Sequence, residues 1–124
     1  MRSPFYIADR YLIPSLYRLL SVKLREKGLL ELEIARELGV SAAAISRYLR
    51  LKRGGLRVEE IGEASKMVED LAESIVRGER VNVDEEIHVI ASKLMARKLL
   101  CDLHGSIYPR LDPATCRVCS RIFR

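Results

Sequence analysis

The most informative stretch of this 124-residue chain spans positions 31 to 55 and reads ELEIARELGVSAAAISRYLRLKRGG. Apolar residues recur at helical spacing on both sides of Gly39, and glycine readily takes the positive φ that a sharp turn requires. Ser41, shortly after the turn, is a good N-cap for a second helix. We therefore predict helices over about 31–38 and 42–51 that form a helix-turn-helix.

The outer face of the second predicted helix has the chemistry of a base-reading surface. In a DNA-binding helix-turn-helix this face enters the major groove. Small alanines permit close approach to base edges and thymine methyl groups, Ser46 can donate or accept a hydrogen bond, and Arg47 can bind O6 and N7 of guanine together. The candidate groove-facing residues are Ser41, Ala42, Ala43, Ser46, Arg47 and Arg50.

A basic run continues beyond these residues. From position 46 to position 57 the chain holds five Lys or Arg residues and no Asp or Glu. Such side chains neutralise phosphates, which sets affinity and register without carrying sequence information. A helix-turn-helix that docks a protein has no need of this acid-free flank, so DNA is the favoured partner. The candidate phosphate contacts are Arg50, Lys52, Arg53 and Arg57.

The positive charge is concentrated in the N-terminal part of the chain. Residues 1–57 hold 12 Lys or Arg and 5 Asp or Glu, a balance of +7. Residues 58–100 hold 6 and 10, a balance of −4, and residues 101–124 hold 4 and 2, a balance of +2. This distribution places the expected nucleic-acid contact in the N-terminal segment.

Several classes of protein are disfavoured. No stretch approaches the roughly eighteen uncharged residues of a transmembrane helix, and the N-terminus, interrupted by Asp9 and Arg10, is not expected to be a secretory signal. We therefore expect a cytoplasmic protein without a membrane partner. The chain has no nucleophile beside a base in sequence and no glycine-rich phosphate loop, so we expect that it is not an enzyme.

Periodicity predicts an all-α fold. Pro14 suits the first turn of a helix that ends before Gly28. A long helix is expected from Val58 to Val76, and another from near Asp84, which can cap it. The apolar stripes of these two helices are expected to pack in the core, with a subunit interface as the alternative for part of one stripe.

These elements divide the chain into three expected segments. A helix-turn-helix domain occupies 1–57, a helical linker or dimerisation region occupies 58–100, and a metal-binding tail occupies 101–124. The tail contains all three cysteines of the chain and one of its two histidines. Clustered thiols in odd number, without an export signal, favour metal binding over a disulfide framework.

The tail has two short chelating motifs. Two residues separate Cys101 from His104 and Cys116 from Cys119, and eleven residues lie between the pairs. Such spacing is typical of a tetrahedral Cys3His zinc site, and the intervening GSIYPRLDPAT is expected to form a compact loop. The alternative is a set of buried, inert thiols.

The whole chain resembles a family of predicted archaeal transcriptional regulators with a lambda-repressor-like helix-turn-helix domain and a C-terminal cysteine cluster. The likeness lies in IARELGVSAAAISRYL, the following KRGG, the long helix from Val58, and CDLH and CRVC in the tail. The resemblance implies a helical bundle with long C-terminal helices. It also implies a homodimer that binds double-stranded DNA at a two-fold related operator.

The identity of the metal and of its fourth ligand is open. Members of this family often carry a further CxxC upstream, where this chain has His88 and Ala91, and their tails look like iron–sulfur sites. The spacing favours Zn²⁺ with His104 as fourth ligand, whereas the resemblance favours a 4Fe-4S cluster in which His88 replaces a cysteine. Either histidine can instead be an ordinary surface or core residue.

The sequence thus predicts a DNA-binding transcription regulator with a metal centre. Zinc would hold the tail folded, whereas a cluster would make the protein a redox or oxygen sensor. The alternative is a zinc-containing RNA- or protein-binding module of a larger assembly, which makes its main contact through the arginines of the tail. These are Arg117, Arg121 and Arg124.

Overall fold

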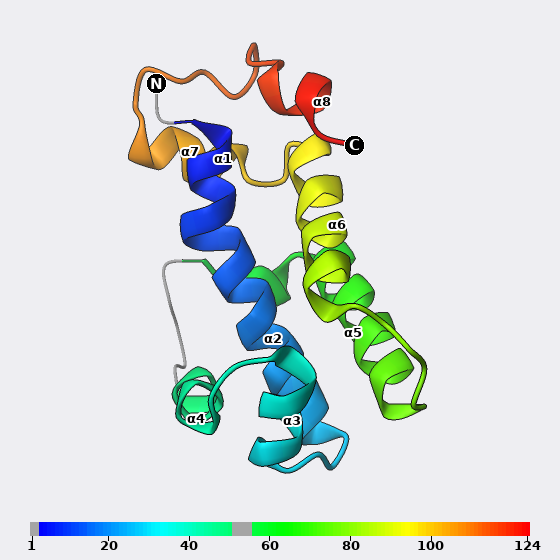
Figure 1. Cartoon of the computed structure of the whole chain (residues 1–124). Helices are drawn as coiled ribbons and strands as arrows, with labels where there is room; N and C mark the ends of the chain where they lie inside the picture. Colours follow the sequence, from blue (N-terminus) through cyan, green and yellow to red (C-terminus); the bar gives the residue numbers. More distant parts are fainter. Residues whose placement is uncertain (1–2, 51–55) are drawn as a thin grey trace.

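The structure, a computed structural model, describes residues 3–50 and 56–124 and is all-helical in these ranges, as predicted. Figure 1 shows one long helix running through the molecule, with α3 and α4 at one end and α7 and α8 at the other. Helices α5 and α6 lie along its side. Within the described part of the chain, no helix is both long and apolar enough to cross a membrane.

The long helix is made of α1 (Pro4–Ile7), a π-helical turn η1 (Ala8–Leu12) and α2 (Ile13–Glu26). Residues 5–12 are therefore helical and continuous with α2, whose predicted start was near Pro14. Proline has no N–H and its ring clashes with the carbonyl four residues earlier, so a normal α-turn is disfavoured there. The wider π turn precedes this point, and the N–H of Ile13 bonds the carbonyl of Ala8, five residues before it.

Helix α3 (Glu31–Leu38) has the predicted bounds, and α4 (Ala42–Arg50) begins where predicted. The predicted end of α4, near residue 51, lies outside the described residues. Gly39 ends α3 with a φ of 68°, and the N–H of Val40 bonds the carbonyl of Ala35 at 3.1 Å. Ser41 then caps α4, since its Oγ accepts a 3.1 Å hydrogen bond from the N–H of Ala44. Local backbone chemistry thus fixes the sharp turn between the two helices.

The predicted helix from Val58 to Val76 is interrupted. A 3-10 turn, η2 (Val58–Glu60), comes first, and α5 (Gly62–Val76) begins after Ile61, whose backbone is extended. The turn is held by tertiary contacts, because Val58 is fully buried and Glu59 accepts a 2.6 Å bond from the guanidinium of Arg18 on α2. The burial of Val58 and the bond between Arg18 and Glu59 together fix the 3-10 turn, which the apolar periodicity of the sequence does not predict.

The remaining helices are α6 (Val83–Ala96), α7 (Cys101–Ile107) and α8 (Val118–Ile122). Asn82 caps α6 through a 3.0 Å bond from the N–H of Glu85, whereas Asp84 was the predicted cap. Asp84 instead accepts a hydrogen bond from the hydroxyl of Tyr17 on α2. The side chain of Asp84, in the first turn of α6, thus joins α6 to α2.

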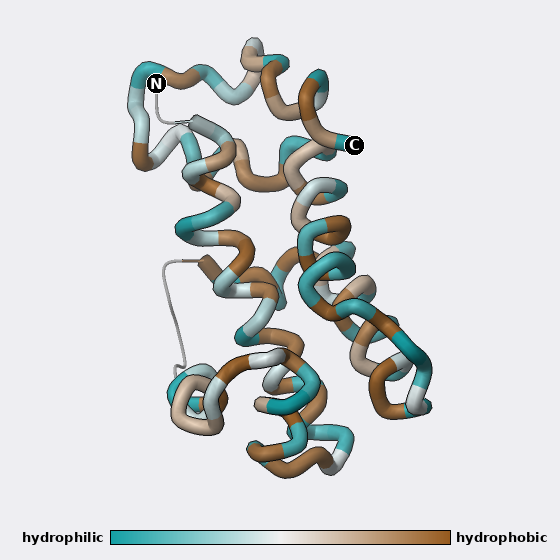
Figure 2. Tube along the Cα trace, viewed as in Figure 1, coloured by the Kyte–Doolittle hydropathy of each residue, from teal (hydrophilic) through white to brown (hydrophobic). Residues whose placement is uncertain are grey.

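A single hydrophobic core includes side chains from all three expected segments. Helix α2 contacts α3, α4, α5 and α6, and Figure 2 shows apolar residues recurring along these helices. The apolar stripes of α5 and α6 lie in this core, in agreement with the core-packing prediction. Their buried members are Ala64, Val68, Leu71, Ala72 and Ile75 on α5 and Val83, Ile87, Ile90, Ala91, Leu94 and Met95 on α6.

We expect Gly39→Ala to lower the free energy of unfolding by about 1 kcal/mol, because a side chain at positive φ is strained. A Cβ at this position meets no atom within 4 Å, so crowding does not contribute. Gly62→Ala is the matched control: it has equal space at an ordinary helical φ and should be neutral or stabilising by about 0.4–1 kcal/mol. Urea unfolding followed by circular dichroism measures both, and equal effects would contradict the assigned turn.

Candidate nucleic-acid interface and metal centre

The exposed face of α4 is narrower than the predicted one. Ala43, Arg47 and Arg50 are exposed and recur at the spacing of one helix face. Ala42 and Ser46 are half-buried, and Ala42 packs against the core. They share the side of α4 that carries Ile45, which is fully buried. The predicted surface therefore reduces to a stripe of one small and two basic side chains.

The charge on the two helices of the turn is opposite. Helix α3 carries three Glu and one Arg, a balance of −2, whereas α4 carries two Arg and no acid, a balance of +2. Among the residues that the structure describes, neither Arg47 nor Arg50 belongs to an ion pair. The exposed positive charge is therefore a property of α4. Lys52 and Arg53, the next candidates, lie outside the described residues.

Other cations of the N-terminal segment have structural roles. Lys23 and Lys27 at the end of α2 both pair with Glu69 on α5, at 3.3 and 2.7 Å. The hydrogen bond from Lys27 lowers the pKa of the Glu69 carboxyl, and the same bond raises the pKa of Lys27. The side chain of Arg18 is largely buried beside Glu59. The balance of +7 thus includes cations that acids of the second segment neutralise.

The candidate phosphate contact Arg57 has a partner as well. Its guanidinium lies 3.5 Å from the carboxylate of Glu60, and both side chains are exposed. Exposed pairs of this kind contribute little and exchange readily with solvent ions. Arg57 is therefore available to a phosphate, but less directly than the arginines of α4.

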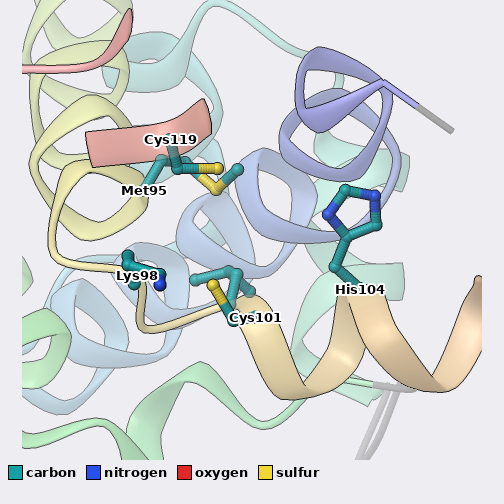
Figure 3. Close-up of a pocket in the computed structure, with 6 residues that line it drawn as sticks. Met95, Lys98, Cys101, His104 and Cys119 are labelled. Carbon is teal, nitrogen blue, oxygen red and sulfur yellow. The ribbon is translucent and has the colours of Figure 1, made fainter. Parts of the chain in front are cut away.

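In the tail, helical turns position the candidate metal ligands. Cys101 and His104 lie one turn apart on α7, and Cys119 lies on α8. These three residues line a cavity of about 10 Å³, which is close to the minimum that holds one water molecule. In Figure 3 the imidazole of His104 stands apart from the two thiols. Cys119 and His104 are 7 and 3% exposed. The fold thus brings both ends of the tail to one small site.

Burial controls the ionisation of the thiols. It raises the pKa of Cys119 to about 11 and also raises the pKa of Cys101. Charge on Cys116 would raise both values further, so this third thiol lies near the other two. The ammonium group of Lys98 acts in the opposite direction on both. Cys101 and Cys119 are therefore protonated at neutral pH unless a bound cation displaces the protons.

Lys98 and Met95 are site residues that sequence reasoning missed. Lys98 follows α6 with a φ of 61°, a conformation that glycine usually supplies, and its Nζ donates a 2.8 Å bond to the carbonyl of Pro113. It thereby fastens the tail to the end of α6. Met95 lines the cavity from α6. Neither residue has a signal in the sequence, because both reach the site through tertiary packing.

The loop between the two chelating motifs is shorter than predicted. Helix α7 extends through Gly105 to Ile107 and so includes its first residues. A Cβ at Gly105 would lie 3.4 Å from Cγ of Pro113, an ordinary van der Waals distance, so α7 packs against the end of the loop at this point.

The donor types suit a soft metal ion, but their arrangement is incomplete. Across residues 3–50 and 56–124, no three His, Cys, Asp or Glu side chains converge closely enough to hold a metal. The structure also separates the two candidate histidines. His104 is one of the residues that line the cavity, whereas His88 is exposed on α6 and its Nδ1 donates a 2.6 Å bond to the carbonyl of Asp84. Of the two, only His104 shares the cavity with two of the thiols.

We expect iodoacetamide to modify Cys119 more slowly than Cys116, by on the order of tenfold, in chelator-treated native protein at pH 8. Burial shields the Cys119 sulfur and keeps it protonated, whereas Cys116 is half-exposed. Mass spectrometry of the tail peptides measures both rates. The same reaction in 6 M guanidinium is the control, in which the difference should disappear; equal rates in the native protein would contradict the burial of Cys119.

Comparison with known proteins adds no relative. No family model, curated protein or solved structure matches this chain. The residues of α4 and of the tail are therefore the features that bear on function.

Proposed function

We propose that this protein is a sequence-specific DNA-binding transcription regulator in which α3 and α4 act as a helix-turn-helix. One observation carries the proposal: an exposed stripe of α4, containing Ala43, Arg47 and Arg50, that is basic and free of acids. A solvated helix face usually mixes both signs of charge, whereas a face that meets DNA must not repel phosphates.

The anchoring of α4 supports a reading role. Ile45 is fully buried, and α4 packs on both α2 and α3. Tight anchoring holds exposed side chains at fixed positions, which base recognition requires. Ser41 supports the same geometry, because its oxygen caps the helix at the end that would approach the bases.

Each side chain of the stripe has a distinct expected role. Arg47, in the middle of α4, would bind O6 and N7 of guanine, while Ala43 would leave room for a thymine methyl group. Arg50 would contact phosphate together with Lys52 and Arg53. Ser46, being half-buried, would reach a base only at the edge of the contact. A homodimer would place two such stripes on related half-sites.

We propose further that the tail binds a metal centre through Cys101, Cys116 and Cys119, with His104 as the fourth ligand. Thiolate and imidazole ligands suit Zn²⁺, which would hold the tail folded, or a 4Fe-4S cluster, which would make DNA binding respond to oxidation. The shared cavity of two of the thiols and His104 supports this set. The exposed position of His88 makes it the weaker candidate.

Arg47→Ala should cost about 1–3 kcal/mol on the best DNA site and relax the preference at one base position. Arg50→Ala should lower the affinity for all DNA duplexes alike. It should also make the slope of log affinity against log salt concentration shallower by about one unit, the loss of one phosphate contact. Selection from a random duplex library, followed by fluorescence anisotropy at several salt concentrations, measures these effects. Arg110→Ala, an exposed arginine of the tail loop, is the matched control and should change neither.

Two outcomes would contradict the DNA-binding proposal. Indistinguishable effects of Arg47→Ala and Arg50→Ala would mean that Arg47 does not read bases. A preference for RNA over duplex DNA that Arg121→Ala abolishes would instead support the RNA-binding alternative.

Removing residues 101–124 would test the role of the tail less clearly than these point variants. Cys119 belongs to the core, and its loss would expose the part of α6 that α8 contacts.

Protein purified without oxygen should contain one zinc ion or one cluster per chain. Elemental analysis and an absorption spectrum distinguish the two, since a cluster absorbs broadly near 400 nm and zinc is colourless. Cys116→Ser and His104→Ala should lower the metal content, while His88→Ala, the control, should leave it unchanged. Metal-free protein with native circular dichroism would contradict the metal centre and assign the thiols to packing.

A further inference from the structure

The hairpin of α5 and α6 has an open groove on its surface. Two adjoining hollows of about 460 and 330 Å³ form it, and Met67 and Lys93 line both. Its accessible apolar lining comes from Met67 and Val81, which are half-buried, and from Val89, which is 39% exposed. Leu71 and Ile90 lie beneath them and are buried in the core. An apolar lining of this kind is a surface that association with a partner can bury.

The charges along this groove are segregated. The hollow at the start of α5 is lined by Lys66, Lys93, Arg97 and Arg124 and by a single acid, Glu63, which pairs with Arg97. This end has a balance of +3, four cations less one carboxylate. The other hollow is lined by two acids, Asp70 and Glu86, and by the Lys93 that it shares with the first hollow, a balance of −1. Within the described chain, no ion pair includes Lys66, Lys93, Asp70 or Glu86.

We propose that this groove binds a second copy of the same chain, related to the first by a two-fold axis. In such an interface the two hairpins run antiparallel, so the basic end of each copy faces the acidic end of the other. A two-fold contact uses the same patch on both partners and therefore requires a patch that is complementary to itself. A groove with one basic and one acidic end meets this requirement.

Other occupants fit the charge pattern less well. An acidic peptide or a nucleic acid would pair with Lys66 and Lys93 but would be repelled by Asp70 and Glu86. A basic partner would pair with Asp70 and Glu86 but would be repelled by Lys66 and Lys93. A second copy is the occupant that brings an opposite charge to both ends and covers the apolar lining between them. The inference deepens the proposed function, because it identifies the surface through which a two-fold regulator would assemble.

The test is the oligomeric state of the full-length chain without DNA, measured by sedimentation at low salt. Wild-type protein should form dimers that weaken as salt is added. Lys66→Glu with Lys93→Glu makes both ends acidic, and Asp70→Lys with Glu86→Lys makes both ends basic. Each double variant should raise the dimer dissociation constant at least about tenfold, since like charges then face each other.

Rescue distinguishes this interface from general damage. An equimolar mixture of the two double variants should form a 1:1 dimer, because an acidic groove then faces a basic one. The quadruple variant, in which the charges are exchanged end for end, should regain the homodimer. Arg10→Glu with Arg110→Glu is the matched control, since both arginines are exposed outside the groove. Circular dichroism checks that every variant is folded.

Three results would overturn the inference: a monomeric wild type at 100 µM, dimers that no groove variant weakens, or variants weakened without rescue in the mixture. Loss of DNA affinity in Lys66→Glu with Lys93→Glu at an unchanged oligomeric state would assign the basic end to nucleic acid instead. None of the sedimentation results depends on α4, so failure here is distinguishable from failure of the DNA-binding proposal.

Discussion

The burial of one long helix is the constraint on which the rest of the structure depends. From Pro4 to Glu26 the chain turns through α1, η1 and α2, and Leu12, Leu16, Leu20 and Leu24 are fully buried along it. Helices α3 to α6 all contact α2, and at the opposite end the rings of Phe5 and Phe123 meet edge to face at 5.3 Å. The two ends of the molecule are therefore positioned by a common element, the long helix from Pro4 to Glu26.

Electrostatics in this protein separates into charges that hold the fold and charges that face solvent. Glu59 and Glu69, which follow the predicted DNA-binding segment in sequence, neutralise Arg18, Lys23 and Lys27 of α2. The pairs fasten the N-terminal segment to α5 and its preceding turn. What remains exposed on α4 is a smaller positive charge than composition indicates, but it is concentrated on one face. Local charge, rather than the net value, is the quantity that bears on a partner.

Elements set by neighbours in sequence could be predicted, and elements set by tertiary contacts could not. Gly39 and Ser41 act on adjacent backbone groups, so α3 has the expected bounds and α4 begins where expected. The break at Ile61 depends on the burial of Val58 and on Arg18, forty residues earlier, and has no local signal. In the candidate sites, residue type and spacing were enough to select the cysteines as candidate metal ligands and the arginines as candidate DNA contacts. The half-burial of Ala42 and Ser46, and the choice between the two histidines near the thiols, depend on packing between helices.

The shared core has a consequence for how this architecture can vary. Cys119 in the tail and Ile45 in α4 belong to one continuous set of buried side chains. An exchange of the tail for an unrelated sequence, by recombination or by engineering, would need a replacement that matches the end of α6 and the ring of Phe5 in shape. The tail therefore cannot be exchanged independently of the rest of the fold. Its sequence is expected to change in step with the helix that begins the chain.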